Sequence, residues 1–122
     1  MEHIFFNMKT GLAATATKVF NAIGISNNIL EEDSLNVLGG IYYEYPILGC
    51  RIKLEQNSYE WEDKYKYMIT VKKDVLSDVT ANEENVRLLL QIVIDLLHRN
   101  LTVEVAVEVG DELEVYRPKY HI

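Results

Sequence analysis

The chain has 122 residues, of which 48% are hydrophobic and 25% are charged, so it can bury one hydrophobic core but not two. Its 19 acidic and 12 basic side chains give a formal charge of -7, which repels nucleic acid and anionic lipid and attracts cationic partners. We therefore expect a single domain over residues 1–122 that binds neither nucleic acid nor membranes directly.

Cysteine content and the longest apolar runs predict the cellular compartment. The only cysteine, Cys50, cannot form an internal disulfide. The N-terminal sequence MEHIFFNMKT lacks the basic start and long apolar run of a secretion signal. The run LLLQIVIDLL falls short of the roughly 20 residues that a membrane span needs. A cytoplasmic protein fits these features.

The first part of the chain predicts one helix. Residues 3–6 stay unassigned, because Ile4 and Phe5 fit either a short edge strand or the start of a helix. From Thr10, the expected N-cap, apolar residues recur at three- and four-residue spacing until Gly24. These residues are Leu12, Ala16, Val19, Phe20 and Ile23. The following segment, SNNILEEDS, reads as a loop because Ser, Asn and Asp favour local side-chain bonds.

Three strands are expected next. Gly39-Gly40 and Pro46 bracket the first strand, IYYEY. Alternation over ILGCRIKLE and DKYKYMITVKK predicts two more. The inward sets are Leu48, Cys50, Ile52 and Leu54, and then Tyr65, Tyr67, Ile69 and Val71. Lys64, Lys66, Met68, Thr70 and Lys72 form the opposite, solvated face.

A second helix begins at Thr80, which forms a predicted capping box with Glu83. One apolar stripe follows: Val86, Leu89, Leu90, Val93, Leu96 and Leu97, widened by Ile92. At roughly 1.5 to 3 kcal/mol for each buried side chain, this helix should be the main source of stability.

A hairpin of two strands closes the chain. Before the turn, Leu101, Val103, Val105 and Val107 alternate with Thr102, Glu104, Ala106 and Glu108. After it, Leu113 and Val115 alternate with Glu112, Glu114 and Tyr116. A two-residue loop would set Val109 opposite Glu112 and mix apolar with polar faces, so we expect a three-residue loop, Val109-Gly110-Asp111, with Glu108 opposite Glu112. The predicted fold is α+β: a mostly antiparallel five-stranded sheet with two main helices packed on it, in the order α-β-β-β-α-β-β.

In that register, Glu104, Glu108, Glu112 and Glu114 share one exposed face that ends at Tyr116. Directly opposed like charges cost a few tenths of a kcal/mol or more, so something should compensate them. Either the lysine face of strand 64–72 lies beside them and forms ion pairs, or the face binds a cationic protein. Carboxylates also suit hard cations, but no calcium-loop spacing occurs, and we expect no metal.

Aromatic residues form a second concentration: Tyr42, Tyr43, Tyr45, Tyr59, Trp61, Tyr65 and Tyr67. On strands many of these would be core residues, whereas exposed Tyr and Trp dominate binding hot spots. Trp61 is the best candidate, with Glu62 and Asp63, because YEWED lacks alternation and reads as a turn. The KYKY segment could stack bases, but the negative charge of the chain disfavours this.

No catalytic pattern is present. Cys50 on an inward face is typical of a small buried hydrophobe, and nothing in the sequence places His98 beside it. His3 and His121 lie near the termini, where disorder is the default. No HExxH, CxxC, GxGxxG, P-loop or GxSxG pattern occurs, so we expect neither an enzyme nor a cofactor.

The acidic hairpin and the segment YEWEDKYKY give the chain its one resemblance. In size, charge and residue classes it resembles the bacterial immunity proteins that neutralise cationic toxin domains, including those of contact-dependent growth inhibition. The resemblance implies a monomer or weak homodimer in a tight complex with a toxin domain, whose lysines and arginines meet carboxylates. Charge and exposure nominate the contact residues Glu104, Glu108, Glu112, Glu114, Tyr116, Trp61, Glu62 and Asp63.

Two alternatives stay open. Type III secretion chaperones are also small, acidic and mixed α/β, and they would dimerise and bind an extended client segment. A small-ligand binder or enzyme on the concave side of the sheet would need converging polar groups, which this sequence does not display.

Overall fold

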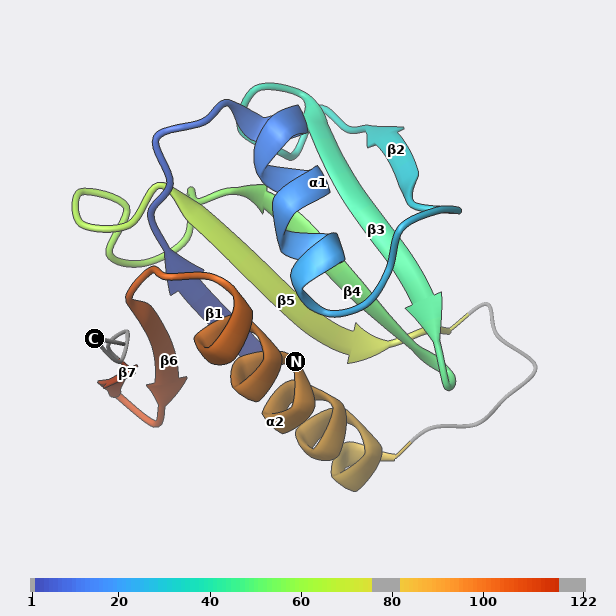
Figure 1. Cartoon of the computed structure of the whole chain (residues 1–122), viewed down its shortest axis with the longest axis vertical. Coiled ribbons are helices and arrows are strands. Elements are labelled where there is room, and N and C mark those ends of the chain that lie inside the picture. The colour runs from blue at the N-terminus through green and yellow to red at the C-terminus, as the bar shows by residue number, and fades with distance from the viewer. Residues whose placement is uncertain (1, 76–81, 117–122) are drawn as a thin grey trace.

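A computed structural model describes residues 2–75 and 82–116. Its elements in chain order are β1 (Glu2–Phe6), α1 (Leu12–Ala22), β2 (Leu30–Asp33), β3 (Ile41–Ile47), β4 (Cys50–Gln56), β5 (Tyr67–Lys73), α2 (Glu83–Asn100), β6 (Val105–Val109) and β7 (Glu112–Tyr116). The strands form one antiparallel sheet in the order β2-β3-β4-β5-β1-β6-β7 (Figure 1). The α+β class with two helices on an antiparallel sheet is confirmed. The expected five strands and their order are wrong, because the described residues form seven.

The N-terminal strand β1 lies inside the sheet, between β5 and β6 (Figure 1). Ile4, Phe5 and Phe6 are each at most 1% exposed, which means that both faces of this strand are covered. A continuous apolar run without alternation is typical of such a strand. His3 is also part of β1, and its Nδ1 lies 3.1 Å from Thr70 Oγ1. The expectation of terminal disorder at His3 is therefore wrong.

The strand β2 is the second element that the sequence did not predict. It pairs with β3, with Glu31 opposite Tyr43, where we expected a loop over residues 26–34. Tertiary pairing has overridden the local turn preference of this acidic segment.

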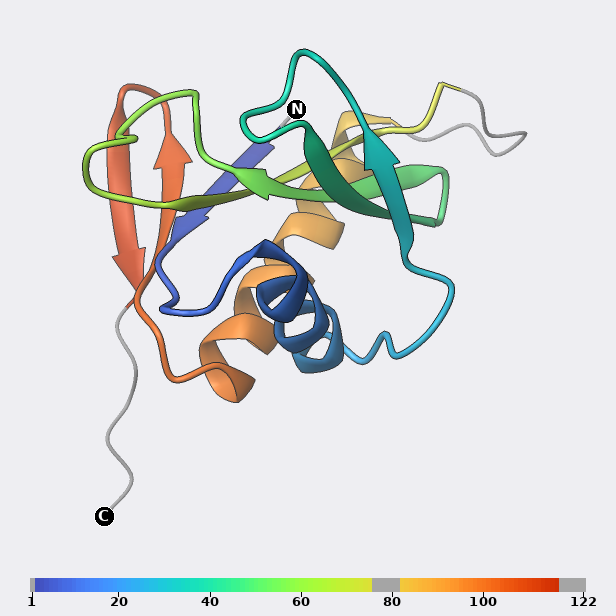
Figure 2. The ribbon, with the colours of Figure 1, turned by 90° about the horizontal axis from the view of Figure 1, so that it is seen from above.

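Both helices pack on the same face of the sheet, which we call the helix face (Figure 2). The core there contains Cys50, Ile52 and Leu54 of β4 and Tyr67, Ile69 and Val71 of β5, so the predicted alternation is confirmed for these residues. Leu48 is instead 73% exposed in the turn before β4. The expectation that Leu48 points inward is wrong, because the turn places it beyond the strand.

Helix α1 begins after Gly11 rather than after Thr10, so the predicted N-cap is displaced by one residue. Thr10 Oγ1 instead lies 2.7 Å from the hydroxyl of Thr15, whose side chain is buried. The helix ends at Ala22, just before Gly24, which adopts a positive φ of 86°.

Helix α2 begins two residues later than predicted. Its N-cap is Asn82, whose side chain accepts from Asn85 N while the Asn85 side chain accepts from Asn82 N, both at 2.9 Å. The predicted cap residue Thr80 lies outside the described residues. The apolar stripe is confirmed for Val86, Leu89, Leu90, Val93 and Leu97. Ile92 is 52% exposed and Ile94 takes its place in the core, so the expected widening by Ile92 is wrong.

The other face of the sheet, the far face, has a hydrophobic cluster of its own. Its buried members are Phe5, Tyr65, Met68 and Ala106, and Trp61, Leu113 and Val115 pack against them. Met68 and Thr70 are 5% and 4% exposed, so the expected solvated face of β5 is largely covered. Tyr65 likewise lies in this cluster and does not share a face with Tyr67.

The hairpin β6–β7 has a two-residue turn. Val109 pairs with Glu112 and Glu108 pairs with Leu113, so the three-residue loop predicted from face matching is wrong. Gly110 has a φ of 62° at the first central position, which is the glycine requirement of a type II′ hairpin turn. The apolar residues Leu113 and Val115 point to the far-face cluster. The loop length was predicted on the assumption that only one face of the hairpin is buried, so the prediction missed this second cluster. No helix among the residues described is both long and apolar enough to cross a membrane.

Candidate functional site

The register of the hairpin divides the predicted acidic face in two. Because paired residues share a face, Glu108 lies on the far face with Leu113, whereas Glu112 and Glu114 lie on the helix face with Val109 and Val107. The expectation that the hairpin glutamates share one face, with Glu108 opposite Glu112, is wrong. The expected lysine strand is not their neighbour either, because β1 separates β5 from β6.

The connection between β4 and β5, residues 57–66, lies beside β6 (Figures 1 and 2). It carries three of the predicted site residues, Trp61, Glu62 and Asp63. One asparagine holds this loop closed. Asn57 is 4% exposed, and its Nδ2 donates to the carbonyls of Glu60 and Tyr65 at 2.8 and 3.0 Å. Its Oδ1 accepts from Tyr59 N at 3.0 Å. The loop is therefore ordered by a buried side chain with several hydrogen bonds.

A second asparagine, which lies outside the loop, also forms hydrogen bonds to the loop backbone. Asn7, which follows β1, donates from Nδ2 to the carbonyl of Lys64 at 2.8 Å and accepts from Lys66 N at 2.7 Å. The loop is thereby tied to the end of β1, an interior strand of the sheet.

Trp61 sits at the middle of this loop in a left-handed conformation, with a φ of 53°. Its carbonyl accepts from the amides of Lys64 and Tyr65 at 2.9 and 2.8 Å, which fixes the turn. Its ring meets the ring of Phe5 edge-on at 5.5 Å. A non-glycine residue in this region is strained, and such strain concentrates at functional sites.

Acidic residues surround Trp61. Tyr59, Glu60, Trp61, Glu62 and Asp63 line a hollow of about 470 Å³. Glu60, Glu62 and Asp63 are exposed, and none of them forms an ion pair with another described residue.

Two glutamates from the chain before and within β6 adjoin the loop. The hydroxyl of Tyr65 donates to Glu104 Oε2 at 2.8 Å. The charge of Glu108 is the main cause that raises the pKa of Tyr59, followed by that of Glu60. We call Tyr59, Glu60, Trp61, Glu62, Asp63, Glu104 and Glu108 the loop surface. The structure thus brings together the predicted residues Trp61, Glu62, Asp63, Glu104 and Glu108.

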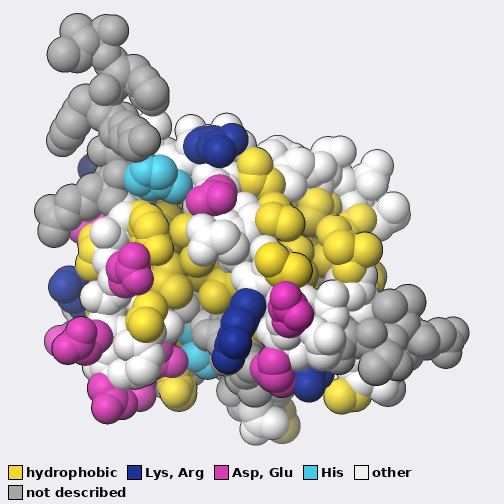
Figure 3. Space-filling view, turned by 90° about the horizontal axis from the view of Figure 1, so that it is seen from below, with side chains coloured by type: hydrophobic (Ala, Val, Ile, Leu, Met, Phe, Trp, Pro, Cys, Tyr) yellow, Lys and Arg dark blue, Asp and Glu magenta, His cyan; other side chains and the backbone are white. Residues whose placement is uncertain are grey.

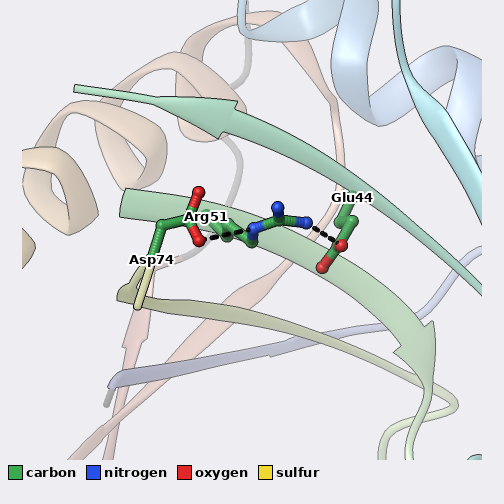
Figure 4. Close-up of polar contacts among 3 residues, drawn as sticks. All are labelled: Glu44, Arg51 and Asp74. Atoms are coloured by element: carbon green, nitrogen blue, oxygen red, sulfur yellow. Dashed lines mark hydrogen bonds and ion pairs between the residues drawn. The ribbon is translucent and has the colours of Figure 1, made fainter. Parts of the chain in front are cut away.

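Basic side chains are engaged in a different part of the sheet. Arg51 lies between two carboxylates, bonding Glu44 through its Nη1 and Asp74 through its Nε at 3.0 Å (Figure 4). Hydrogen bonding to Asp74 is the main cause that raises the pKa of Arg51. These three side chains span β3, β4 and the end of β5, and both carboxylates are largely buried, at 7% side-chain exposure. We regard this cluster as structural because both carboxylates are largely buried and share the Arg51 guanidinium.

Two further ion pairs follow the same trend. Lys53 pairs with Glu55 at 3.0 Å, and Lys73 pairs with Glu83 at 2.8 Å. These contacts lie on β4, at the end of β5 and at the start of α2. The four ion pairs between described residues therefore involve β3, β4, the end of β5 and the start of α2, whereas the exposed carboxylates of the 57–66 connection and of β2 form none.

The other predicted residues, Glu112, Glu114 and Tyr116, lie on the helix face of the hairpin. A groove of about 380 Å³ between α2 and the hairpin is lined by Glu114 and Tyr116 together with Arg87, Leu90 and Ile94 of α2. Tyr116 donates to Glu114 Oε1 at 2.9 Å and packs edge-on against His98 at 6.2 Å. Burial and Glu114 raise the pKa of Tyr116.

Chemistry at Cys50 is disfavoured by its surroundings. The side chain is 1% exposed, and burial, followed by the charge of Asp74, raises the pKa of its thiol. A raised pKa lowers the fraction of reactive thiolate. Among residues 2–75 and 82–116, no group of three or more His, Cys, Asp and Glu side chains is placed to hold a metal ion.

The sequence did not identify the residues whose hydrogen bonds hold the loop surface in place. Asn57 and Asn7 carry no motif, and their partners are backbone atoms of residues 59–66. The apolar run Ile4-Phe5-Phe6 was the available signal for a strand covered on both faces, and hence for a second cluster. Comparisons with protein-family models, with curated proteins and with solved structures gave no match for this chain.

Proposed function

We propose that this protein binds a cationic protein partner through the loop surface, as an immunity protein binds a basic toxin domain. The observation that carries the proposal is the environment of Trp61. Its aromatic side chain lies on an ordered loop, and Glu60, Glu62 and Asp63 line the same hollow. These three carboxylates form no ion pair with another described residue. Unneutralised carboxylates repel one another, and a basic partner would relieve that repulsion.

The order of the loop favours tight binding. A loop held by Asn57 and Asn7 loses little conformational entropy when a partner docks on it. Tyr59, which is 49% exposed, and Trp61 offer rigid aromatic area of the kind that forms hot spots. The carboxylates around them would supply long-range steering and specificity.

The nature of the partner follows from charge. With a formal charge of -7, the chain repels polyphosphate, so nucleic acid is a poor candidate. A nuclease toxin that is itself basic would present lysines and arginines to this surface in place of its substrate. Neutralisation would then follow from occupying the basic site.

Association kinetics test the proposal. The probe is the purified product of the reading frame adjacent to this one, which an immunity protein would recognise. A triple variant, Glu60→Gln with Glu62→Gln and Asp63→Asn, should slow association by about tenfold at low salt, and high salt should reduce the difference. The fluorescence of Trp61, the only tryptophan in the chain, should change on binding.

The matched control removes equal charge from the opposite edge of the sheet. Glu31→Gln with Glu32→Gln and Asp33→Asn changes β2, and it should slow association by about twofold at most. Equal effects of the two triple variants, or no complex at all, would contradict the proposal. A dimer in sedimentation experiments without the partner would instead favour the secretion-chaperone alternative.

A further inference from the structure

The sheet ends at β7, and no described segment pairs with the outer edge of this strand (Figure 1). An unpaired edge presents backbone donors and acceptors to which a strand of another chain can add. The β6–β7 hairpin also borders the loop surface, because Leu113, Val115 and Trp61 pack against the same far-face cluster. The edge is therefore continuous with the binding surface proposed above.

The turn determines which backbone groups face outward. In a tight turn the residues that flank the central pair are hydrogen-bonded to each other, here Val109 and Glu112. Hydrogen-bonded and non-bonded pairs alternate along an antiparallel ladder. It follows that Leu113 and Val115 direct their amides and carbonyls away from β6, to the free edge.

The side chains of β7 alternate between acid and apolar. Glu112 and Glu114 lie on the helix face, are exposed and form no ion pair with another described residue. Leu113 and Val115 lie on the far face, half-buried against the cluster that contains Trp61. Figure 3 shows acidic side chains gathered at the side of the molecule where this hairpin lies, next to hydrophobic ones.

We propose that a strand of the cationic partner adds antiparallel to β7 and extends the sheet. Its basic side chains lie beside Glu112 and Glu114, and its apolar side chains lie beside Leu113 and Val115 and enlarge the far-face cluster. This inference rests on the proposed function and specifies how the partner docks: by backbone pairing at the edge, with the loop surface as the adjoining contact.

A second copy of this chain is a poor occupant of the same edge. Antiparallel self-pairing centred on β7 sets Glu114 opposite Glu114, and like charges in that position are destabilising. A basic strand replaces this repulsion by attraction.

The other edge strand, β2, lacks the same pattern. Its acids lie on both faces, because Glu31 pairs with Tyr43 and Glu32 pairs with Tyr42. The β2 edge therefore serves as an internal control.

The test uses a short capped peptide in which lysine and valine alternate, followed by amide NMR of the whole protein. At saturating peptide, exchange of the Leu113 and Val115 amides should slow by about tenfold, with no comparable change at β2. A peptide of the same composition with lysines and valines in separate blocks should not protect these amides. Glu112→Gln with Glu114→Gln should weaken binding by about fivefold at low salt, and Glu31→Gln with Glu32→Gln should not.

Methylated peptides examine the backbone pairing directly. In antiparallel addition the valines opposite Leu113 and Val115 direct their amides to β7, so N-methylation of the valines should abolish binding and N-methylation of the lysines should preserve it.

Equal loss in both peptides, protection outside β7, or dimerisation of the free protein through β7 would overturn the inference. The Glu60, Glu62 and Asp63 triple variant should still bind the peptide. If it slows partner capture while the peptide fails to bind, only the strand addition is refuted.

Discussion

The ring of Trp61 stands edge-on to the ring of Phe5, with 5.5 Å between the centroids and 72° between the planes. Phe5 is fully buried in the interior strand β1, so this contact joins an exposed acidic loop to the far-face cluster. Residues that should bind a partner thereby also stabilise the fold. Stability and binding must be measured separately at this position.

Replacing Trp61 with alanine should destabilise the protein by about 1 to 3 kcal/mol, because a partly buried aromatic contact is lost. Trp61→Gly should be no less stable than Trp61→Ala, because glycine adopts the observed positive φ without strain. Urea unfolding followed by circular dichroism measures both. A glycine variant clearly less stable than the alanine variant would show that the left-handed conformation is not retained.

Asn57→Ala should cost about 2 to 4 kcal/mol, because three side-chain hydrogen bonds are lost and the carbonyls of Glu60 and Tyr65 lose their donor. Asn7→Ala removes two bonds at an exposed position and should cost about 1 kcal/mol. Limited proteolysis should cut the Asn57 variant within residues 57–66 before the rest of the chain. Equal proteolysis of the variant and the parent protein would show that Asn57 does not hold the loop.

Val93→Asp in α2 should unfold the domain, because it places a charge at a position that is 2% exposed in the main core. Gln91→Asp on the same helix should change the melting temperature little, since Gln91 is exposed and, among the residues that the structure describes, its side chain bonds only Asp95, at 3.2 Å. Thermal melts distinguish the two. Equal melting temperatures would mean that the stripe is assigned to the wrong face.

The amphipathic parts of the chain could be predicted because each buries one face. The stripe of α2 and the alternation of Ile52 and Leu54 against charged neighbours gave the helix face correctly. The strand β1 could not be predicted in the same way, since Ile4, Phe5 and Phe6 are all buried and show no period. Its partners β5 and β6 also lie far away in the sequence, and such pairing leaves no local pattern.

The candidate site was predictable by residue type but not by arrangement. Trp61, Glu62 and Asp63 stand out in YEWED because the segment lacks alternation. The separation of Glu112 and Glu114 from Glu108 depends on one residue of loop length at Gly110, whereas the grouping of Glu104 and Glu108 with Trp61 depends on the long-range pairing of β6 with β1. A shift of one residue moves every following side chain to the other face, so face matching against a single core gave the wrong register.

Arg51→Met should destabilise the protein by about 3 kcal/mol or more, because it leaves Glu44 and Asp74 nearly buried without their cation. Adding Glu44→Gln and Asp74→Asn to the same variant should recover much of the loss, since the uncompensated charges are gone. Urea unfolding of the single and triple variants measures the difference. A triple variant less stable than Arg51→Met would show that the buried charges are not the cause.

Tyr43 provides a pH-dependent prediction. The hydrogen bond that it donates to Glu31 at 2.6 Å is the main cause that raises its pKa to about 12. A folded-state pKa above the unfolded value of about 10 means that the contribution of Tyr43 to stability is complete below pH 10 and is lost as the pH rises towards 12. Phenolate absorbance of the folded protein, compared with that of Tyr43→Phe, isolates this titration. Glu31→Gln should lower the pKa of Tyr43 towards the ordinary tyrosine range. Glu32→Gln, on the other face of β2, should leave this pKa unchanged. Equal shifts in both variants would refute the assignment to Glu31.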